Sequence, residues 1–286
     1  MRLEHNQASA SRWMLLVAAI LFSTGGAVIK ACALTPWQVA SFRSGISAAV
    51  LLLLLPGARR GWSLRIVTVA IAYALTLVLF VLATRNTTAA NAIFLQATAP
   101  VYLILTGPWL LKEPIRKGEV LQMLCLTAGM WLFFLDPVKT SVTAPNPQLG
   151  NLFAACSGFT WASTVLGLRW VSKTSPDSFA AAVLGNIFAF LFVLPMALPV
   201  ENFKLADGMV LLYLGVFQVG LSYVLLTRAI RHVGALESSL ILLVEPALNP
   251  WWAWLVQGEV PGAIAIAGAA LIFGGTVTRV RLANRE

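Results

Sequence analysis

Two similar stretches of the chain decide its fold: residues 96–113, QATAPVYLILTGPWLLKE, and residues 242–259, LLVEPALNPWWAWLVQGE. Each stretch is mostly apolar, carries a proline near its start (Pro100 or Pro246) and ends on a glutamate (Glu113 or Glu259). The two prolines are 146 residues apart, and so are the two glutamates. This constant offset indicates that the second half of the chain repeats the first.

A second set of matches lies upstream of these stretches. Pro36 corresponds to Pro176 and Gly45 to Gly185, both at an offset of 140 residues. Each half of the chain then contains five long apolar runs. Because five is an odd number, we expect the second half to cross the membrane in the opposite direction to the first. Inverted repeats are typical of secondary transporters, whose substrate site lies near the bilayer midplane between the repeats.

The composition also predicts a membrane protein. Of the 286 residues, 59% are hydrophobic and 11% are charged, whereas a soluble domain carries roughly 25% charged residues. The apolar content excludes intrinsic disorder, and the long unbroken runs argue against a transmembrane β-barrel. We therefore predict an all-α integral membrane protein with ten transmembrane helices in two inverted five-helix repeats. The predicted parts are an N-terminal tail at 1–12, a first repeat at 13–136, a connecting loop at 137–149, a second repeat at 150–279 and a C-terminal tail at 280–286.

The distribution of Lys and Arg predicts the orientation of these spans. Of the 20 basic residues, 15 lie on the side of the two tails, four lie on the opposite side, and Arg43 lies within a predicted span. By the positive-inside rule, both termini are expected in the cytoplasm. Because the net charge of +9 is explained by this topology, we expect no nucleic-acid partner.

Residues for catalysis are scarce. The two histidines, His5 and His232, lie in a tail and in a loop, and the three cysteines are not clustered. A phosphate-binding motif of the GxxxxGKS or GxxxxGKT type is absent, which argues against ATP hydrolysis by this chain. We therefore predict no catalytic residues, no metal site and no cofactor, and we do not expect an enzyme.

Three further motifs, together with the paired proline–glutamate stretches, carry a resemblance to a known family. They are FSTGGAVIK at 22–30, TPWQVASFRSG at 35–45 and GFTWASTVLGLRW at 158–170. With these motifs the chain resembles the EamA-type members of the drug/metabolite transporter superfamily over nearly its whole length. The resemblance implies two inverted bundles in a bacterial inner membrane and a central cavity formed by the first, third, fourth, sixth, eighth and ninth helices. It also implies export, since characterised bacterial relatives mostly export amino acids, including aromatic ones, and other metabolites.

Glu245 is the acidic residue predicted nearest to the membrane midplane. An acid inside a span is a functional hypothesis by default, and here it would bind an amino group of the substrate or carry a proton. The alternative is a structural role, either as a neutral acid or as the partner of Arg43. For Arg43 we favour a structural role, because a long side chain near the end of a span extends to the membrane surface.

The two repeated prolines are predicted to act as hinges. A proline inside a helix frees a backbone carbonyl and bends the helix. At equivalent positions of two repeats, Pro100 and Pro246 would shape or gate the cavity, and the alternative is a static bend. Glu113 and Glu259 are predicted to cap helix N-termini or turns next to the ends of these helices.

Polar and aromatic side chains within the spans supply the remaining candidates. Amides are costly against lipid, so they are expected to face inward, although a hydrogen bond between two helices explains each of them equally well. Trp161 is the preferred aromatic candidate because it lies mid-span rather than at the interface. The predicted substrate-binding residues are Ser23, Thr24, Tyr73, Thr76, Asn91, Gln96, Trp161, Ser163, Gln218, Tyr223, Glu245 and Asn249, and the predicted hinge or gating residues are Gly25, Gly26, Pro100 and Pro246.

The sequence thus favours a secondary transporter that exports amino acids or related small metabolites by exposing a central cavity alternately to the two sides of the membrane. A membrane-embedded lipid-modifying enzyme and a metabolite channel are the alternatives. The expected partners are a small-molecule substrate and membrane lipids, with the chain as a monomer or a weak homodimer.

Overall fold

The structure is a computed structural model that describes residues 2–59, 62–99, 101–102, 124–125, 127–129, 131–132, 135, 141–174, 179–233, 238 and 241–283. Within these residues the chain is helical apart from turns and short connections, and no β-strand occurs there. The end of the predicted fourth helix and most of the predicted fifth helix fall outside the described residues, as do Pro100 and Glu113.

The first half of the chain contributes six described helical elements and the second half seven. In the first half they are α1 (Arg2–Ser23), α2 (Gly25–Ala31), α3 (Pro36–Leu54), the short 3-10 helix η1 (Pro56–Arg59), α4 (Leu64–Asn86) and α5 (Ala89–Gln96). In the second half they are α8 (Pro147–Thr174), α9 (Phe179–Ala197), α10 (Leu205–Tyr213), the π-helix η2 (Leu214–Leu221), α11 (Ser222–Ala229), α13 (Val244–Gln257) and α14 (Ala263–Ala283).

Hydroxyl side chains fix the starts of several of these helices. Thr35 accepts a hydrogen bond from the backbone N–H of Gln38, whose side chain accepts one from the Thr35 backbone in return, so α3 begins with a capping box. Ser63 and Thr88 cap α4 and α5 in the simpler way, by accepting from the backbone three residues later.

Five segments of the described chain are long and apolar enough to cross a membrane: Ala10–Ala31, Pro36–Leu54, Leu64–Asn86, Phe179–Ala197 and Leu205–Ala229. Large apolar side chains such as Leu53, Leu64 and Phe192 point outward and are exposed. Such a surface is unfavourable in water and suits contact with lipid. The described part of the chain is therefore helical, and its apolar helices are suited to a membrane, as the sequence predicts.

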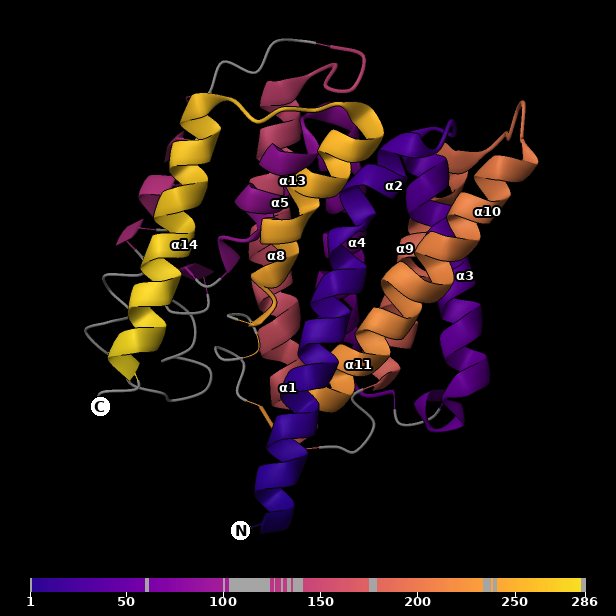
Figure 1. Cartoon of the computed structure of the whole chain (residues 1–286). Helices are drawn as coiled ribbons and strands as arrows, with labels where there is room; N and C mark the ends of the chain where they lie inside the picture. Colours follow the sequence, from indigo (N-terminus) through magenta and orange to yellow (C-terminus); the bar gives the residue numbers. More distant parts are fainter. Residues whose placement is uncertain are drawn as a thin grey trace.

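Most of the helices lie side by side in one bundle, and α14 lies at one edge of it (Figure 1). Helix α4 packs against α8 and α9, α3 packs against α9, and α1 packs against α11 and α13. Helix α1 begins, and α14 ends, at the same end of the bundle, and α2 and the end of α13 lie at the opposite end (Figure 1).

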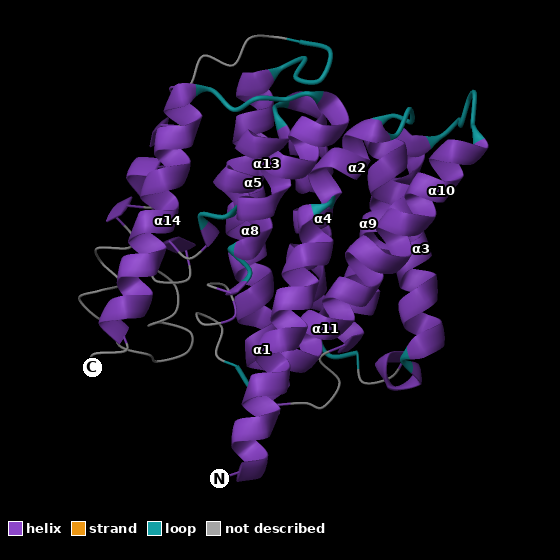
Figure 2. Ribbon diagram, viewed as in Figure 1, coloured by secondary structure: helices purple, strands orange, loops and turns teal. Residues whose placement is uncertain are grey.

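Three of the predicted spans are interrupted inside the bundle (Figure 2). A turn at Thr24 separates α1 from α2, within the predicted first helix. Helix α5 ends in a turn at Ala97–Thr98, two residues before Pro100, and α13 begins after a turn at Leu242–Leu243, three residues before Pro246. Since Pro246 has no N–H, the backbone of Glu245 instead bonds to the Leu242 carbonyl at 2.9 Å in a tighter turn. Pro246 therefore lies in the first turn of α13 and not, as the sequence predicts, deep within one long helix.

Candidate functional site

A pocket lies inside the bundle where these interrupted helices meet. Its walls come from α1, α3, α4, α5, α8, η2, α11 and α13, so residues from both halves of the chain line it. The lining residues are Phe22, Arg43, Leu77, Phe80, Gln96, Trp161, Gln218, Val219, Tyr223 and Glu245. The family resemblance predicts a cavity lined by the same helices, with one difference. Helix α3, the predicted second helix, also contributes a lining residue, Arg43.

A second pocket adjoins the first beside the break in α13. It is lined by Gln96, Trp161 and Glu245, which it shares with the first pocket, and by Pro246 and the two residues of the break, Leu242 and Leu243. The carboxyl group of Glu245 is therefore next to both spaces, and the discontinuous backbone forms part of the wall. Broken helices at a binding site are a recurrent feature of secondary transporters.

The guanidinium of Arg43 is buried in the wall of the first pocket. Arg43 is 1% exposed, and its Nη atoms donate to the Leu77 carbonyl at 2.8 Å and to Gln218 Oε1 at 3.2 Å. The expectation that Arg43 extends to the membrane surface is therefore wrong, because its donors are used inside the bundle. The alternative pairing with Glu245 is not formed either, since no ion pair joins these two described residues.

Glu245 faces the pocket and has no hydrogen-bond or ion-pair partner among the residues that the structure describes. It is 9% exposed and lies in the first turn of α13. The positive end of a helix dipole favours a carboxylate in the first helical turn, but this alone does not replace a buried counter-charge.

Aromatic rings form the wall next to the two charged groups. The Tyr223 ring packs edge-on against Phe22 and Trp161, with ring centroids 5.2 and 6.0 Å apart. Phe22 and Trp161 also contact each other edge-on at 6.1 Å, and this arrangement is favourable for aromatic pairs. This aromatic wall, consisting of Phe22, Trp161 and Tyr223, gives the pocket an apolar surface that it shares with Arg43 and Glu245.

The predicted site residues divide into two groups. One group lines the pockets and consists of Gln96, Trp161, Gln218, Tyr223, Glu245 and Pro246. The other group is not in the lining of either pocket and consists of Ser23, Thr24, Gly25, Gly26, Tyr73, Thr76, Asn91, Ser163 and Asn249. Pro100 lies outside the described residues.

Several members of the second group support the pocket wall from behind. The Tyr73 ring packs on Tyr223 at 4.3 Å, and its hydroxyl accepts from Asn186 Nδ2 at 2.7 Å. Gln96 donates to the Ser157 hydroxyl at 2.6 Å, and Ser157 in turn donates to the Thr76 carbonyl at 3.4 Å. Tyr73, Asn186, Ser157 and Thr76 therefore support Tyr223 and Gln96 without lining the pocket themselves.

The remaining members connect helices away from the pocket. Asn249 donates to the Ser23 carbonyl at 3.1 Å, and the Thr24 hydroxyl bonds to the Tyr213 hydroxyl at 2.9 Å. Asn91 donates to Asn151 at 3.3 Å. Ser163 donates to the Phe159 carbonyl of its own helix at 2.9 Å. Asn249, Thr24 and Asn91 therefore make the hydrogen bonds between helices that the sequence predicts as the alternative to substrate binding. Ser163 does not, because its bond stays within its own helix.

The two predicted hinge glycines permit close contacts between helices. A Cβ atom on Gly25 would lie 2.6 Å from Gln218 Nε2, and one on Gly26 would lie 2.8 Å from Asn249 Nδ2. Since real Cβ atoms essentially never approach this closely, these glycines let the start of α2 contact η2 and α13.

Arg43 is the functional candidate that the sequence interpretation missed. It is the only Lys or Arg placed inside a predicted span, and charged residues at such places face a cavity or a partner by default. That signal was present in the sequence, but it was outweighed by the assumption that the side chain reaches the membrane surface.

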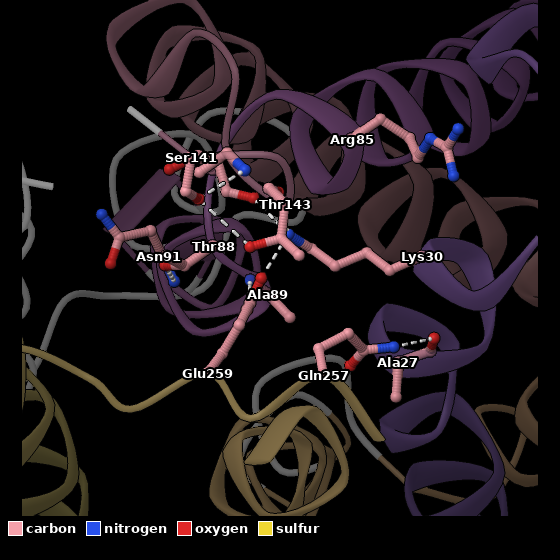
Figure 3. A network of polar contacts seen from close by, with 12 residues as sticks. Ala27, Lys30, Arg85, Thr88, Ala89, Asn91, Ser141, Thr143, Gln257 and Glu259 are labelled. Carbon is pink, nitrogen blue, oxygen red and sulfur yellow. Dashed lines mark hydrogen bonds and ion pairs between the residues drawn. The ribbon is translucent and has the colours of Figure 1, made fainter. Parts of the chain in front are cut away.

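At the far end of the bundle from the start of α1, a polar network ties several segments together (Figure 3). Lys30 Nζ lies 2.6 Å from Glu259 Oε1, and it also donates to the Thr87 carbonyl at 2.8 Å and to the Thr143 carbonyl. The second Glu259 oxygen accepts from the backbone of Ala89 at 2.8 Å and so caps the N-terminus of α5. Glu259 therefore caps a helix, but one in the other half of the chain.

This fold and this site define a polytopic membrane protein with a pocket inside the bundle that carries both polar and aromatic groups. A model of the EamA-like transporter family matches residues 11–135 and 148–280. The chain therefore belongs to the EamA-like transporter family, within the drug/metabolite transporter superfamily, as the sequence motifs predict.

Known proteins related to this chain are transporters. Over 270 residues the chain is 27% identical to the pseudopaline exporter CntI of Pseudomonas aeruginosa, covering 91% of this chain and 92% of the relative. Over 288 residues it is 24% identical to an uncharacterized transporter of Clostridium kluyveri, covering 92% and 90%. The family and these relatives are transporters or exporters and not enzymes, in agreement with the sequence prediction.

The fold is also that of a solved protein structure. A crystal structure superposes with a TM-score of 0.70 at 19% sequence identity, covering 97% of this chain and 98% of the other. At this identity the match concerns the fold alone.

Proposed function

We propose that this chain is a secondary carrier that exports amino acids, including aromatic ones, or related small metabolites across the bacterial inner membrane. Its pocket would open alternately to the two sides. The observation that carries this proposal is the pocket itself, which holds an arginine, a glutamate and an aromatic wall inside an apolar bundle. The name of one relative, a pseudopaline exporter, supports the export direction.

We further propose ten membrane spans in two inverted five-helix repeats, at 13–136 and 150–279, joined by the loop at 137–149. Two features support this arrangement. The helix breaks at Ala97–Thr98 and Leu242–Leu243 lie within one residue of equivalent positions, two and three residues before the repeated prolines. In addition, the first helix, α1, begins and the last helix, α14, ends at the same end of the bundle (Figure 1), as an even number of spans requires.

The charge distribution supports cytoplasmic termini at 1–12 and 280–286. The network around Lys30 and Glu259 would then lie at the periplasmic end and close the pocket on that side. Membrane lipids and one small-molecule substrate are sufficient partners for this mechanism, and a monomer or a weak homodimer would carry it out.

The test is transport by the purified protein in proteoliposomes. Vesicles loaded with an unlabelled amino acid are diluted into the same labelled amino acid, and its uptake is followed for each member of a panel. A carrier shows saturable uptake that is accelerated by internal substrate, whereas a channel shows non-saturable flux that the internal substrate does not accelerate. If no amino acid is transported, the amino-acid form of the proposal is wrong.

A further inference from the structure

We infer that the pocket recognises a zwitterion with an apolar side chain, and that its carboxylate binds Arg43 while its ammonium binds Glu245. This inference rests on the proposed transport function and assigns the substrate-binding groups within it. It gives Arg43, a residue otherwise regarded as structural, the role of selecting the substrate.

The first step concerns the unsatisfied charge of Arg43. A guanidinium carries five N–H donors, and the structure shows two hydrogen bonds from it, to Leu77 and to Gln218. Its Nε has no hydrogen-bond partner. No carboxylate of the described residues forms an ion pair with Arg43, although burying a charge without a counter-charge is strongly unfavourable. A negatively charged group of a ligand in the pocket would supply the missing counter-charge.

The second step concerns the geometry that holds the guanidinium in place. Gln218 lies in the π-helix η2, and its Oε1 accepts from Arg43 at 3.2 Å. On the other side of this amide, Gly25 leaves room for the Gln218 side chain, since a Cβ at position 25 would lie 2.6 Å from its Nε2. π-helical segments occur frequently at functional sites. A planar guanidinium fixed in this way is suited to a carboxylate, which it binds through paired hydrogen bonds.

The third step concerns the opposite charge in the same pocket. Glu245 lines the pocket with Arg43, is 9% exposed, and has no hydrogen bond or ion pair with the described residues. Arg43 and Glu245 share the pocket but do not contact one another. A ligand with both a carboxylate and an ammonium group would supply a counter-charge to each of them. A ligand with only one charge would leave the other residue unpaired, and this penalty gives the pocket its selectivity.

The fourth step concerns the rest of the ligand. The remaining walls are the aromatic wall of Phe22, Trp161 and Tyr223 and the apolar residues Leu77, Phe80 and Val219. Such a surface binds an apolar side chain and disfavours an additional charge. The chemistry of this lining therefore suits an amino acid with an apolar or aromatic side chain better than a polyamine, a sugar or a simple carboxylic acid.

The test compares matched ligands on the unmodified protein. The probes are L-phenylalanine, 2-phenylethylamine, which lacks the carboxylate, and 3-phenylpropionate, which lacks the amine, together with the corresponding sets for leucine and methionine. Each probe is measured by thermal stabilisation of the purified protein and by competition for transport in proteoliposomes. We expect at least one zwitterion to compete at least tenfold more strongly than both of its single-charge analogues. Equal competition by an amine or an acid would overturn the inference.

A variant measurement assigns the carboxylate to Arg43. Arg43→Gln should lose at least tenfold in affinity for the zwitterion while its affinity for the amine analogue stays the same, and Arg43→Lys should recover part of the loss. Arg228→Gln, at an exposed position of α11, serves as the control and should bind as the unmodified protein does. If Arg43→Gln does not fold, the ligand comparison above still tests the requirement for a zwitterion, and Arg43→Lys then tests the assignment of the carboxylate to Arg43.

The two possible failures can be told apart. If no compound is transported, the proposed function fails, and the assignment of the substrate class fails with it. If a compound is transported regardless of whether it carries a carboxylate, the protein is a carrier and only the role assigned to Arg43 is wrong.

Discussion

The ammonium of Lys30 and the carboxylate of Glu259 lie 2.6 Å apart, and their side chains are only 4% and 8% exposed. Lys30 is in α2 of the first half, and Glu259 directly follows α13 of the second half. This buried ion pair therefore joins the two halves of the chain at one end of the bundle.

Breaking this pair should destabilise the protein. Glu259→Gln leaves the Lys30 charge buried without a counter-charge, which typically costs about 3–5 kcal/mol. Lys30→Met should have a comparable effect, and the double variant should be less destabilised than the sum of the two single variants. Thermal unfolding in detergent measures all three, with Glu201→Gln at an exposed position as the control. Additive effects of the two single variants would contradict this prediction.

Gly25→Ala should weaken substrate binding through Gln218. The added Cβ would lie 2.6 Å from Gln218 Nε2, so the amide must move and its hydrogen bond with Arg43 is disturbed. We expect a loss of about tenfold in affinity, which corresponds to about 1.4 kcal/mol. The control is Gly57→Ala, where a Cβ atom meets nothing within 4 Å. Unchanged affinity in the Gly25 variant would show that the Gln218 position is unimportant.

Trp161→Ala should reduce the affinity for aromatic substrates. Trp161 contacts Phe22 and Tyr223 edge-on, and each such pair contributes about 0.5–1.5 kcal/mol beyond the buried area. We expect KM to rise about tenfold with alanine and less with phenylalanine, which keeps an aromatic ring. Trp254→Ala, at a position that is 53% exposed, should leave KM unchanged. If KM rises equally in Trp161→Ala and in the control Trp254→Ala, the effect is a general loss of structure and not the loss of a substrate contact.

Glu245→Gln should change both binding and the response to pH. Glutamine keeps the shape of glutamate and removes the charge, so the ammonium of the substrate loses its counter-charge. We expect weaker binding by about tenfold and transport rates that no longer vary with pH, measured as initial uptake rates at several pH values. Glu201→Gln is again the matched control. If pH-dependent transport survives in the Glu245 variant, Glu245 is not the proton carrier.

Pro246→Ala should slow transport more than it weakens binding. Alanine restores the N–H that proline lacks, which favours a continuous helix across the break at Leu242–Leu243. A pocket wall without this break would keep its side chains but change conformation less readily. We expect a lower maximal rate with KM changed less than threefold, measured by uptake in proteoliposomes. A larger change in KM than in the rate would indicate that Pro246 shapes the pocket and is not a hinge.

The sequence predicts the fold class well because apolar runs of span length have few other uses. The repeated proline and glutamate positions and the family resemblance also depend only on spacing along the chain. For the same reason Gln96, Trp161, Gln218, Tyr223 and Glu245 could be selected, since polar or aromatic groups at mid-span rarely face lipid.

The three-dimensional partners could not be predicted in this way. Asn249 and Gln218 are both amides within spans, yet Asn249 bonds to the Ser23 carbonyl and Gln218 bonds to Arg43 in the pocket. Which of them faces the pocket depends on the rotation of each helix, and the π-helix at Leu214–Leu221 alters that rotation locally. The burial of Arg43 was missed because distance from the end of a span does not reveal the direction of its side chain.

The contacts of Lys30 have one more consequence. An ammonium group has three N–H bonds, and those of Lys30 meet three acceptors: Glu259, the Thr87 carbonyl and the Thr143 carbonyl. These acceptors belong to three separate segments, which follow α13, follow α4 and precede α8. Moving any one of these segments away leaves one N–H of Lys30 without its present acceptor. A single nitrogen atom therefore couples three segments that are far apart in the sequence.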